Sequence, residues 1–268
     1  MRVIINIIFM LAILILLCRC EDIDVIETDV PYEEHVVVRA ELVADVVFSG
    51  VSFTKTLPLN VEYTIEKAEL KNVVTYIQID RQKIIPLYYS VRGIYKPVND
   101  LLIEPGKIYE LYAKVGTKNI YAYTTVPDQP QVHSVLNEGV FLSGKVESEN
   151  DEIFGAIWAI VEGSNTILTS AGDFYDMVQF QQNSQTGGVY VRTIDIPELY
   201  LTPYYSSRLY IRVYAYDEQY LDYFSTQNAH NPIENIFAQS GGNIIWNVQG
   251  DAIGLFIGVA KGNLIRAN

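Results

Sequence analysis

The sequence predicts a mainly β protein, and three observations point to this class. Several segments alternate apolar and polar residues with the period of two that a half-buried strand requires. Glycine, proline and asparagine clusters separate these segments, as turns do in layered β folds. Among the segments after residue 34, a helical spacing of apolar residues occurs in residues 217–228. The pattern therefore predicts a β-sandwich type of fold with one short helix.

The N-terminal segment precedes this pattern and reads as a secretory signal. Arg2 is followed by residues 3–17, which are apolar except for Asn6. A short basic start before an apolar core of 7–15 residues is typical of a signal peptide. As a helix, 15 residues would span roughly 22 Å, less than the ~30 Å of a bilayer core. A signal peptide over residues 1–19 is the interpretation, and a retained membrane anchor is the alternative.

Cys18 and Cys20 are the two cysteines of the chain. A disulfide across one residue would be strained, and the three scattered histidines supply no recognisable metal site. A cysteine just after an apolar core instead matches a bacterial lipoprotein signal, with Cys20 as the lipidated residue. Arg19 stands where such signals usually have a small residue. Residues 20–34 are then an acidic tether, and we expect no metal and no cofactor.

The formal net charge of −13 excludes some classes of partner. Nucleic-acid binding requires basic surface, and electrostatic docking on anionic lipid also requires it. We therefore expect no nucleic-acid partner, and attachment to the membrane through a lipid chain.

Three segments show the strand alternation most clearly. Residues 35–43 place Val36, Val38, Ala40 and Leu42 on one face; residues 107–115 place Glu110, Tyr112 and Lys114 outward; residues 208–216 alternate in the same way. Pro105-Gly106 suits the centre of a type II turn before the second of these strands.

Two prolines in TTVPDQPQV (124–132) favour a domain boundary, giving domains 35–128 and 129–268.

The C-terminal part is predicted to contain the helix and the last strands. DEQYLDYFSTQN (217–228) places Tyr220, Leu221, Tyr223 and Phe224 at helical spacing behind a possible Asp217 cap. Residues 244–248 and 253–260 are predicted as final strands. The second of these is nearly all apolar, as in a central strand.

Three stretches together resemble one family. They are CEDID, LIEPGKIYELYAKVGTKNIYAYTTVPDQPQV (102–132) and YAYDEQYLDYFSTQN…NPIENIF…NIIWNVQGDAIGLFIG (214–258). In this order they resemble Bacteroidota outer-membrane lipoproteins classed as a domain of unknown function. The resemblance implies an immunoglobulin-like β-sandwich followed by a second β-rich, sandwich-like domain. It also implies a cell-envelope location and genes near TonB-dependent receptors, and it brings no catalytic residues.

The 20 tyrosines supply the candidate contact residues. A tyrosine offers a flat apolar ring with a polar tip, which suits glycan or peptide recognition. Tyr200, Tyr204 and Tyr205 lie in a loop-like stretch before the strand 208–216. Tyr210, Arg212 and Tyr214 share one face of that strand, and the alternative is that the helix 217–228 covers them.

The sequence therefore predicts a non-enzymatic, lipid-anchored lipoprotein of the outer membrane. It leaves open which leaflet holds the lipid. Its expected partner is a TonB-dependent receptor, or the glycan or peptide ligand that such a receptor imports. A fimbrial or adhesin-type β-sandwich subunit is the alternative. A carbohydrate-active enzyme is a third hypothesis, which would require two carboxylates flanking a substrate pocket.

Overall fold

The computed structural model describes residues 32–147, 153–170, 181–182, 188–228 and 244–267. The predicted signal peptide, Cys20 and the tether up to residue 31 lie outside these described residues. By its contacts the chain divides into Met1–Glu33 and Glu34–Asn268, and the second unit is the one described below. Within the described ranges, no helix is both long and apolar enough to cross a membrane.

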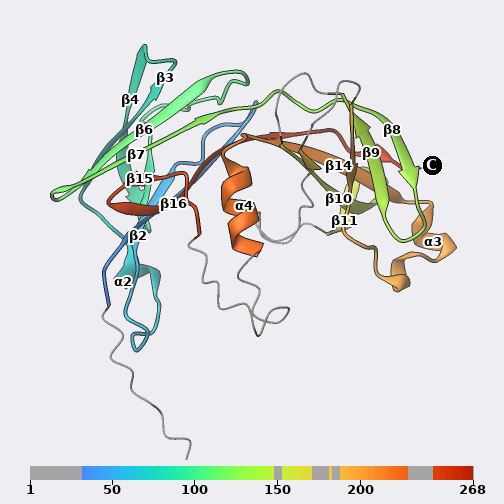
Figure 1. Ribbon diagram of the computed structural model, residues 1–268, viewed down its shortest axis with the longest axis horizontal. Coiled ribbons are helices and arrows are strands. Elements are labelled where there is room, and N and C mark those ends of the chain that lie inside the picture. Colours follow the sequence, from blue (N-terminus) through green and yellow to red (C-terminus); the bar gives the residue numbers. More distant parts are fainter. Residues whose placement is uncertain (1–31, 148–152, 171–180, 183–187, 229–243, 268) are drawn as a thin grey trace, which may run out of the picture. The chain divides into compact units, whose positions relative to one another are not determined.

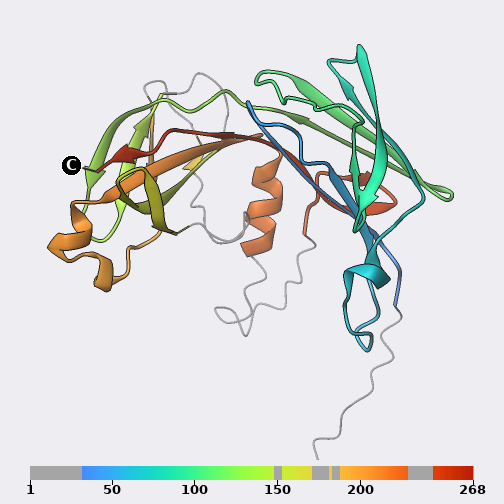
Figure 2. The ribbon, with the colours of Figure 1, turned by 180° about the vertical axis from the view of Figure 1, so that it is seen from behind.

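The prediction of a mainly β protein is confirmed (Figures 1 and 2). One large sheet has the strand order β11-β10-β14-β16-β1-β2-β5-β4-β3-β6-β7-β15, and a small sheet has the order β13-β9-β8. The immunoglobulin-like assignment within this class stays a prediction.

The large sheet folds over so that two of its stretches enclose a core. The first stretch contains β16 (Ala252–Lys261), β1 (Val36–Val43), β2 (Val51–Lys55) and β5 (Ile94–Lys96). The second contains β4 (Lys83–Val91), β3 (Val73–Ile79), β6 (Ile108–Val115), β7 (Lys118–Thr125) and β15 (Gln249–Gly250), and α2 (Ile65–Ala68) precedes β3. Val38, Phe53, Leu111 and Ala122, all fully buried, come from both stretches and pack in one cluster.

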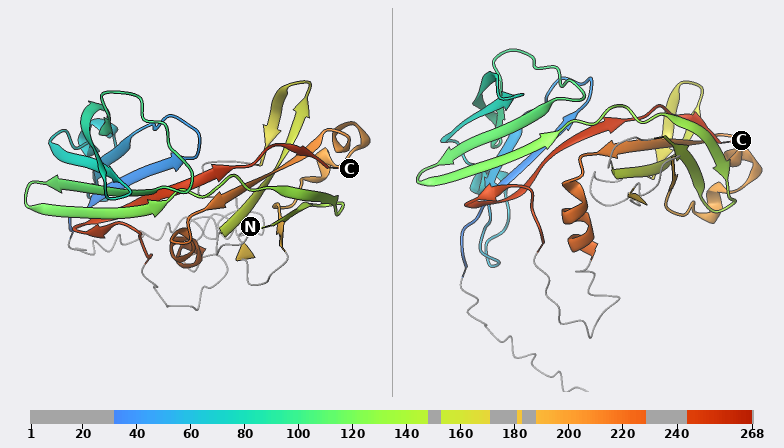
Figure 3. Two further views of the ribbon diagram at one scale, coloured as in Figure 1. Left: turned by 90° about the horizontal axis from the view of Figure 1, so that it is seen from above. Right: turned by 45° about the horizontal axis from the view of Figure 1, so that its top comes forward.

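The other end of the large sheet is covered on both faces (Figure 3). Its strands are β10 (Ile153–Glu162), β14 (Leu209–Tyr216), β11 (Asn165–Thr169), β12 (Gln181–Gln182) and β17 (Ile265–Arg266). The small sheet, β8 (Val132–Asn137), β9 (Leu142–Val146) and β13 (Val189–Arg192), packs on one face through Leu142, Val146 and Val191. The short helices η1 (Glu198–Tyr200) and α3 (Pro203–Ser206) lie beside that core, and α4 (Tyr220–Asn228) packs on the opposite face.

Strand β16 belongs to both parts. It pairs in parallel with β1 along its length and antiparallel with β14 at its C-terminal end. Phe256 packs in the core with β1, whereas Ala260 packs in the core beneath β14. A chain segment from after residue 128 is therefore an integral strand beside residues 36–43.

The predicted strands 35–43, 107–115 and 208–216 are β1, β6 and β14, and the predicted strand 253–260 is β16. The buried positions of β1 are Val36, Val38, Ala40 and Leu42, as the alternation indicated. Gly106 has φ 71°, the conformation that a type II turn requires at its third residue.

The strand predicted over residues 244–248 is wrong, because these residues have no strand pairing. Asn247 attaches this stretch to β16 through its side chain, without strand pairing. Its amide nitrogen donates to the Phe256 carbonyl at 2.6 Å, and its side-chain oxygen accepts from the Phe256 N–H at 2.9 Å. One side chain thus supplies both bonds that a neighbouring backbone would supply.

The predicted helix exists but starts later, at Tyr220 rather than residue 217. Asp217 precedes it and is buried: its carboxylate accepts from the Gln219 N–H, as the predicted cap would, and is also bonded to another strand. Its carboxylate accepts from the Thr124 hydroxyl at 2.6 Å and from the Thr125 N–H at 3.0 Å, both on β7. The Thr124 hydroxyl oxygen in turn accepts from the Gly258 N–H of β16 at 2.7 Å. This Asp217 cluster joins β7, β16 and the start of α4.

Gly258 allows the end of β7 to lie against β16. A Cβ built on Gly258 would come 2.6 Å from the Thr125 carbonyl oxygen and 2.8 Å from the Val126 Cα. Both neighbours are backbone atoms, so a larger residue would separate the two strands and break the Asp217 cluster.

We predict that Thr124→Val lowers the free energy of unfolding by about 1–3 kcal/mol, because it leaves the Asp217 carboxylate and the Gly258 N–H each short of a bond in a dry site. Urea unfolding measures the change. Thr125→Val is the matched control, since Thr125 contributes its backbone N–H to Asp217 and has an exposed side chain. Equal stability of the two variants would contradict the structural role of the hydroxyl.

Candidate functional site

The outer face of the second stretch of the sheet contains an ordered set of tyrosines. Alternate residues of β3, β6 and β7 point away from the core, as their burial patterns show. The strand register places Tyr76 opposite Tyr112 and Tyr112 opposite Tyr121. We call this set, together with Tyr123 two residues further along β7, the tyrosine face.

The rings of the tyrosine face are in contact across the strands. Tyr76 and Tyr112 are stacked with centroids 5.0 Å apart and 16° between planes. Tyr121 lies 5.1 Å from Tyr112 but tilted by 53°, so it turns part of its ring away from the stack. Tyr123 follows at 6.1 Å and is 38% exposed. Aromatic contacts of this kind add ~0.5–1.5 kcal/mol per pair beyond burial, which holds the rings in place.

Glu110 lies on the same face of β6, between Gln78 and Tyr123 in the register. The sequence predicted an outward-facing residue, and the orientation is right, although the residue is only 5% exposed. Its Oε1 accepts from the Tyr121 hydroxyl at 2.9 Å and from the Tyr112 hydroxyl at 3.4 Å. Its Oε2 is buried and has no hydrogen-bond partner in the part of the chain that the structure describes. The neighbouring tyrosines, invisible to a single-strand pattern, are what cover it.

The electrostatics of the face follow from this carboxylate. Burial raises the pKa of Tyr121 to about 12, and the hydrogen bond to Glu110 and its negative charge act in the same direction. Burial also raises the pKa of Tyr112, again with the Glu110 charge contributing. Both hydroxyls therefore stay protonated at neutral pH and donate to Glu110, which fixes the direction of both rings.

A groove of about 480 Å³ lies over two adjoining rows of this face. One row is Tyr76, Tyr112 and Tyr121, and the next row is Val74, Lys114 and Asn119. Gln249 and Gly250 of β15, which pair with β7, also line it. A groove of this size matches the volume of small-molecule sites.

Among the described residues that line the groove, none is Asp or Glu, and Asp251 lies beside it with its carboxylate bonded to the Asn119 N–H. The lining instead combines aromatic rings, two primary amides and one ammonium group. Such a set binds by ring contact and hydrogen bonding.

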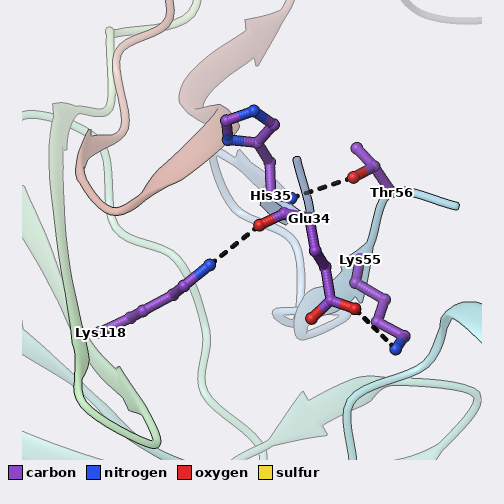
Figure 4. A network of polar contacts seen from close by, with 5 residues as sticks. All are labelled: Glu34, His35, Lys55, Thr56 and Lys118. Atoms are coloured by element: carbon purple, nitrogen blue, oxygen red, sulfur yellow. Dashed lines mark hydrogen bonds and ion pairs between the residues drawn. The ribbon is translucent and has the colours of Figure 1, made fainter. Parts of the chain in front are cut away.

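Glu34 and His35, just before β1, are bonded to β7 and to the end of β2 (Figure 4). The Lys118 ammonium, one residue before Asn119, donates to the Glu34 carbonyl at 2.9 Å. The Glu34 carboxylate pairs with Lys55 at 2.8 Å, and the His35 N–H donates to the Thr56 hydroxyl at 3.0 Å. The exposed ion pair contributes only ~0–1 kcal/mol, so the network fixes position more than stability.

Of the predicted contact residues Tyr200, Tyr204 and Tyr205, only Tyr204 is strongly exposed, at 57%. Tyr200 and Tyr205 pack against the core under the small sheet, and Tyr200 lies 5.7 Å from Trp158. The Arg208 guanidinium lies 4.1 Å above the Tyr204 ring. These tyrosines, from η1 and α3, form an edge-to-face cluster.

The second predicted set, Tyr210, Arg212 and Tyr214, lies on one face of β14 as expected, and all three side chains are half-buried. Tyr214 packs at the edge of the cluster formed with α4, where Tyr216 stacks on Tyr220 at 5.1 Å. The alternative prediction, that the helix covers this face of the strand, is therefore right for the end that contains Tyr214. The Arg212 Nε is buried without a hydrogen-bond partner among the described residues.

The tyrosine face was missed as a site, although the sequence contained part of its signal. Tyr112 was placed outward on the strand 107–115, and NIYAYTT repeats tyrosine with the same period. What aligned these residues with Tyr76 is the register of three strands, which no single segment specifies.

No protein-family model, curated protein or solved structure matches this chain. The resemblance to outer-membrane lipoproteins therefore rests on the sequence motifs and stays a prediction.

We predict that Glu110→Gln lowers the pKa of Tyr121 from about 12 toward, though not to, the ordinary value of 10.0. A neutral amide removes the charge that disfavours the phenolate, while burial, the larger cause, remains. The difference between the alkaline absorbance titrations with and without Tyr121→Phe isolates this residue, with circular dichroism confirming that the fold persists.

Glu66→Gln is the matched control, because Glu66 is exposed on α2 and makes the same charge change elsewhere. An unchanged Tyr121 titration in Glu110→Gln would contradict the coupling between the two groups.

Proposed function

We propose that the protein is a non-enzymatic lipoprotein of the cell envelope that binds through its tyrosine face. A lipid on Cys20 holds it to the outer membrane. The partner is a TonB-dependent receptor, and the face engages that receptor or the ligand it imports. The observation on which the proposal depends is the groove beside three register-aligned tyrosines.

Three properties of the face support binding. Its rings are held by mutual contact and by Glu110, so little conformational freedom is lost when a ligand settles on them. Tyrosine is among the residue types that dominate binding energy at interfaces. The groove also offers amide and ammonium groups for hydrogen bonds next to apolar ring surface, the combination found in specific ligand sites.

The tether supports the membrane part of the proposal. Between Cys20 and Glu34 the chain advances 14 positions, so an extended tether reaches about 50 Å. Attachment within that distance of a membrane partner raises the effective concentration of the binding face without any new contact. Glu34, where this reach ends, is bonded to Lys118 beside the groove.

The fimbrial alternative requires a terminal strand that can be exchanged between subunits. Strand β16 is paired on one side with β1 and on the other with β14 of the same chain. This arrangement gives strand exchange no support, so we do not propose it.

We predict that Cys20→Ser abolishes membrane retention, because it removes the site of lipid attachment. Membrane fractionation and mass spectrometry of the mature N-terminus measure this. Cys18→Ser is the matched control and is expected to remain membrane-bound, since Cys18 would be discarded with the signal peptide. Unchanged retention of Cys20→Ser would mean that residues 3–17 stay as the anchor.

For the partner, a TonB-dependent receptor is expected to co-purify with the wild-type protein from native membranes. Deletion of the gene is expected to reduce uptake through that receptor. Tyr76→Ala should reproduce the reduction, whereas Tyr190→Ala, which removes an exposed tyrosine from β13, should not. The proposal fails when no receptor co-purifies and deletion leaves uptake unchanged.

A further inference from the structure

The groove on the tyrosine face has a composition that indicates the class of its ligand. In a chain of net charge −13, the charges around the groove are of both signs: Lys114 lines it, Glu110 is buried behind Tyr121, and Asp251 is exposed beside it and accepts from the Asn119 N–H at 3.3 Å. A strongly acidic or strongly basic ligand would find no matching field here. The surface suits a neutral ligand.

The polar groups of the groove are mainly primary amides. The side chains of Asn119 and Gln249 both line it, and within the described residues neither makes a hydrogen bond. A primary amide presents a donor pair and an acceptor side by side. Neighbouring hydroxyls of a sugar present the same pair in return, so each amide can satisfy two hydroxyls at once.

The apolar part of the groove is ring surface, supplied by Tyr76, Tyr112 and Tyr121. Tyr76 and Tyr112 stack on each other, whereas the Tyr121 ring is tilted by 53° from Tyr112. The C–H face of a pyranose is flat and weakly positive, and it packs on the negative face of an aromatic ring. Asn119 and Gln249 both flank Tyr121, the first two residues away on β7 and the second directly opposite on β15.

We propose that this groove is a binding site for a neutral saccharide, with one sugar unit packed on Tyr121 and its hydroxyls bonded by Asn119 and Gln249. Lys114 donates to a further hydroxyl or ring oxygen. Glu110 is a positioning residue: by accepting from the Tyr121 and Tyr112 hydroxyls it holds both rings before the ligand arrives. The inference deepens the proposed function, on which it rests, by naming the class of ligand.

A peptide is the competing class of ligand, and the groove favours it less. Peptides that bind β-sheets usually add a strand to an open edge, with backbone bonds supplying the affinity. The groove lies over the face of β6 and β7, and β15 pairs with β7 at residues 120 and 121 beside it. Face binding beside a paired edge suits a compact ring better than an extended backbone.

The test uses the purified soluble chain from Glu21 onward on an array of neutral oligosaccharides of hexoses and N-acetylhexosamines, with sulfated and sialylated glycans and a peptide library alongside. We expect binding to at least one neutral glycan. Tyr121→Ala and Asn119→Ala should each weaken it roughly tenfold or more, the equivalent of ~1.4 kcal/mol. Tyr190→Ala and Asn99→Ala, which remove an exposed tyrosine and an exposed amide elsewhere, should leave it unchanged.

Glu110→Gln tests the positioning role separately. We expect weaker glycan binding together with the lowered Tyr121 pKa, and Tyr121→Phe should also bind more weakly while keeping its ring. Glycan binding that is unaffected by Tyr121→Ala would overturn the site. Binding only to charged glycans or only to peptides, or no binding at all, would overturn the ligand class.

These outcomes are separate from those of the proposed function. Receptor co-purification and reduced uptake without any neutral-glycan binding would leave the accessory function standing and reject the saccharide. Neutral-glycan binding without a co-purifying receptor or a change in uptake would support the saccharide site and reject the accessory function.

Discussion

The buried bonds of Asp217 to β7, and of Thr124 to β16, are the constraint on which the arrangement of this unit depends. Strand β7 contributes Tyr121 and Tyr123 to the tyrosine face, β16 is shared by both parts, and Asp217 marks the turn into α4. The bonds among them lie where Gly258 allows two backbones to touch. Burial raises the pKa of Asp217, so the carboxylate is kept there at some cost, which the three donors around it offset.

The parallel pairing of β1 and β16 is a second long-range constraint. Parallel neighbours require a long connection, and here almost the entire unit lies between the two strands. The first and last long strands thus close the structure on each other, and the core with Phe256 forms only when both are present. A contact between such distant segments is slow to form and strongly cooperative.

The tyrosine face shows how a site arises from register. Tyr76, Tyr112 and Tyr121 come from three different strands, and Tyr123 is the next outward residue after Tyr121 on β7. No one of them is unusual by itself. Brought together, their hydroxyls converge on Glu110, whose burial comes from the rings around it. The carboxylate holds the rings, and the rings exclude water from the carboxylate, so the face is organised before any ligand binds.

The sequence by itself determined the class of fold and most individual strands, because strand alternation is a local property of each segment. Residues 35–43, 107–115, 208–216 and 253–260 show this, and Pro105-Gly106 shows it for a turn. It also indicated the helix and Asp217 as its cap, but not the later first turn at Tyr220, nor the bonds that the same carboxylate makes to a distant strand. Only the tertiary structure decided that Asn247 bonds residues 244–248 to β16, and that β16 pairs with β1. It alone also placed Tyr76, Tyr112 and Tyr121 in one row across three strands. These depend on pairing between segments far apart in the chain, which a one-dimensional period cannot specify.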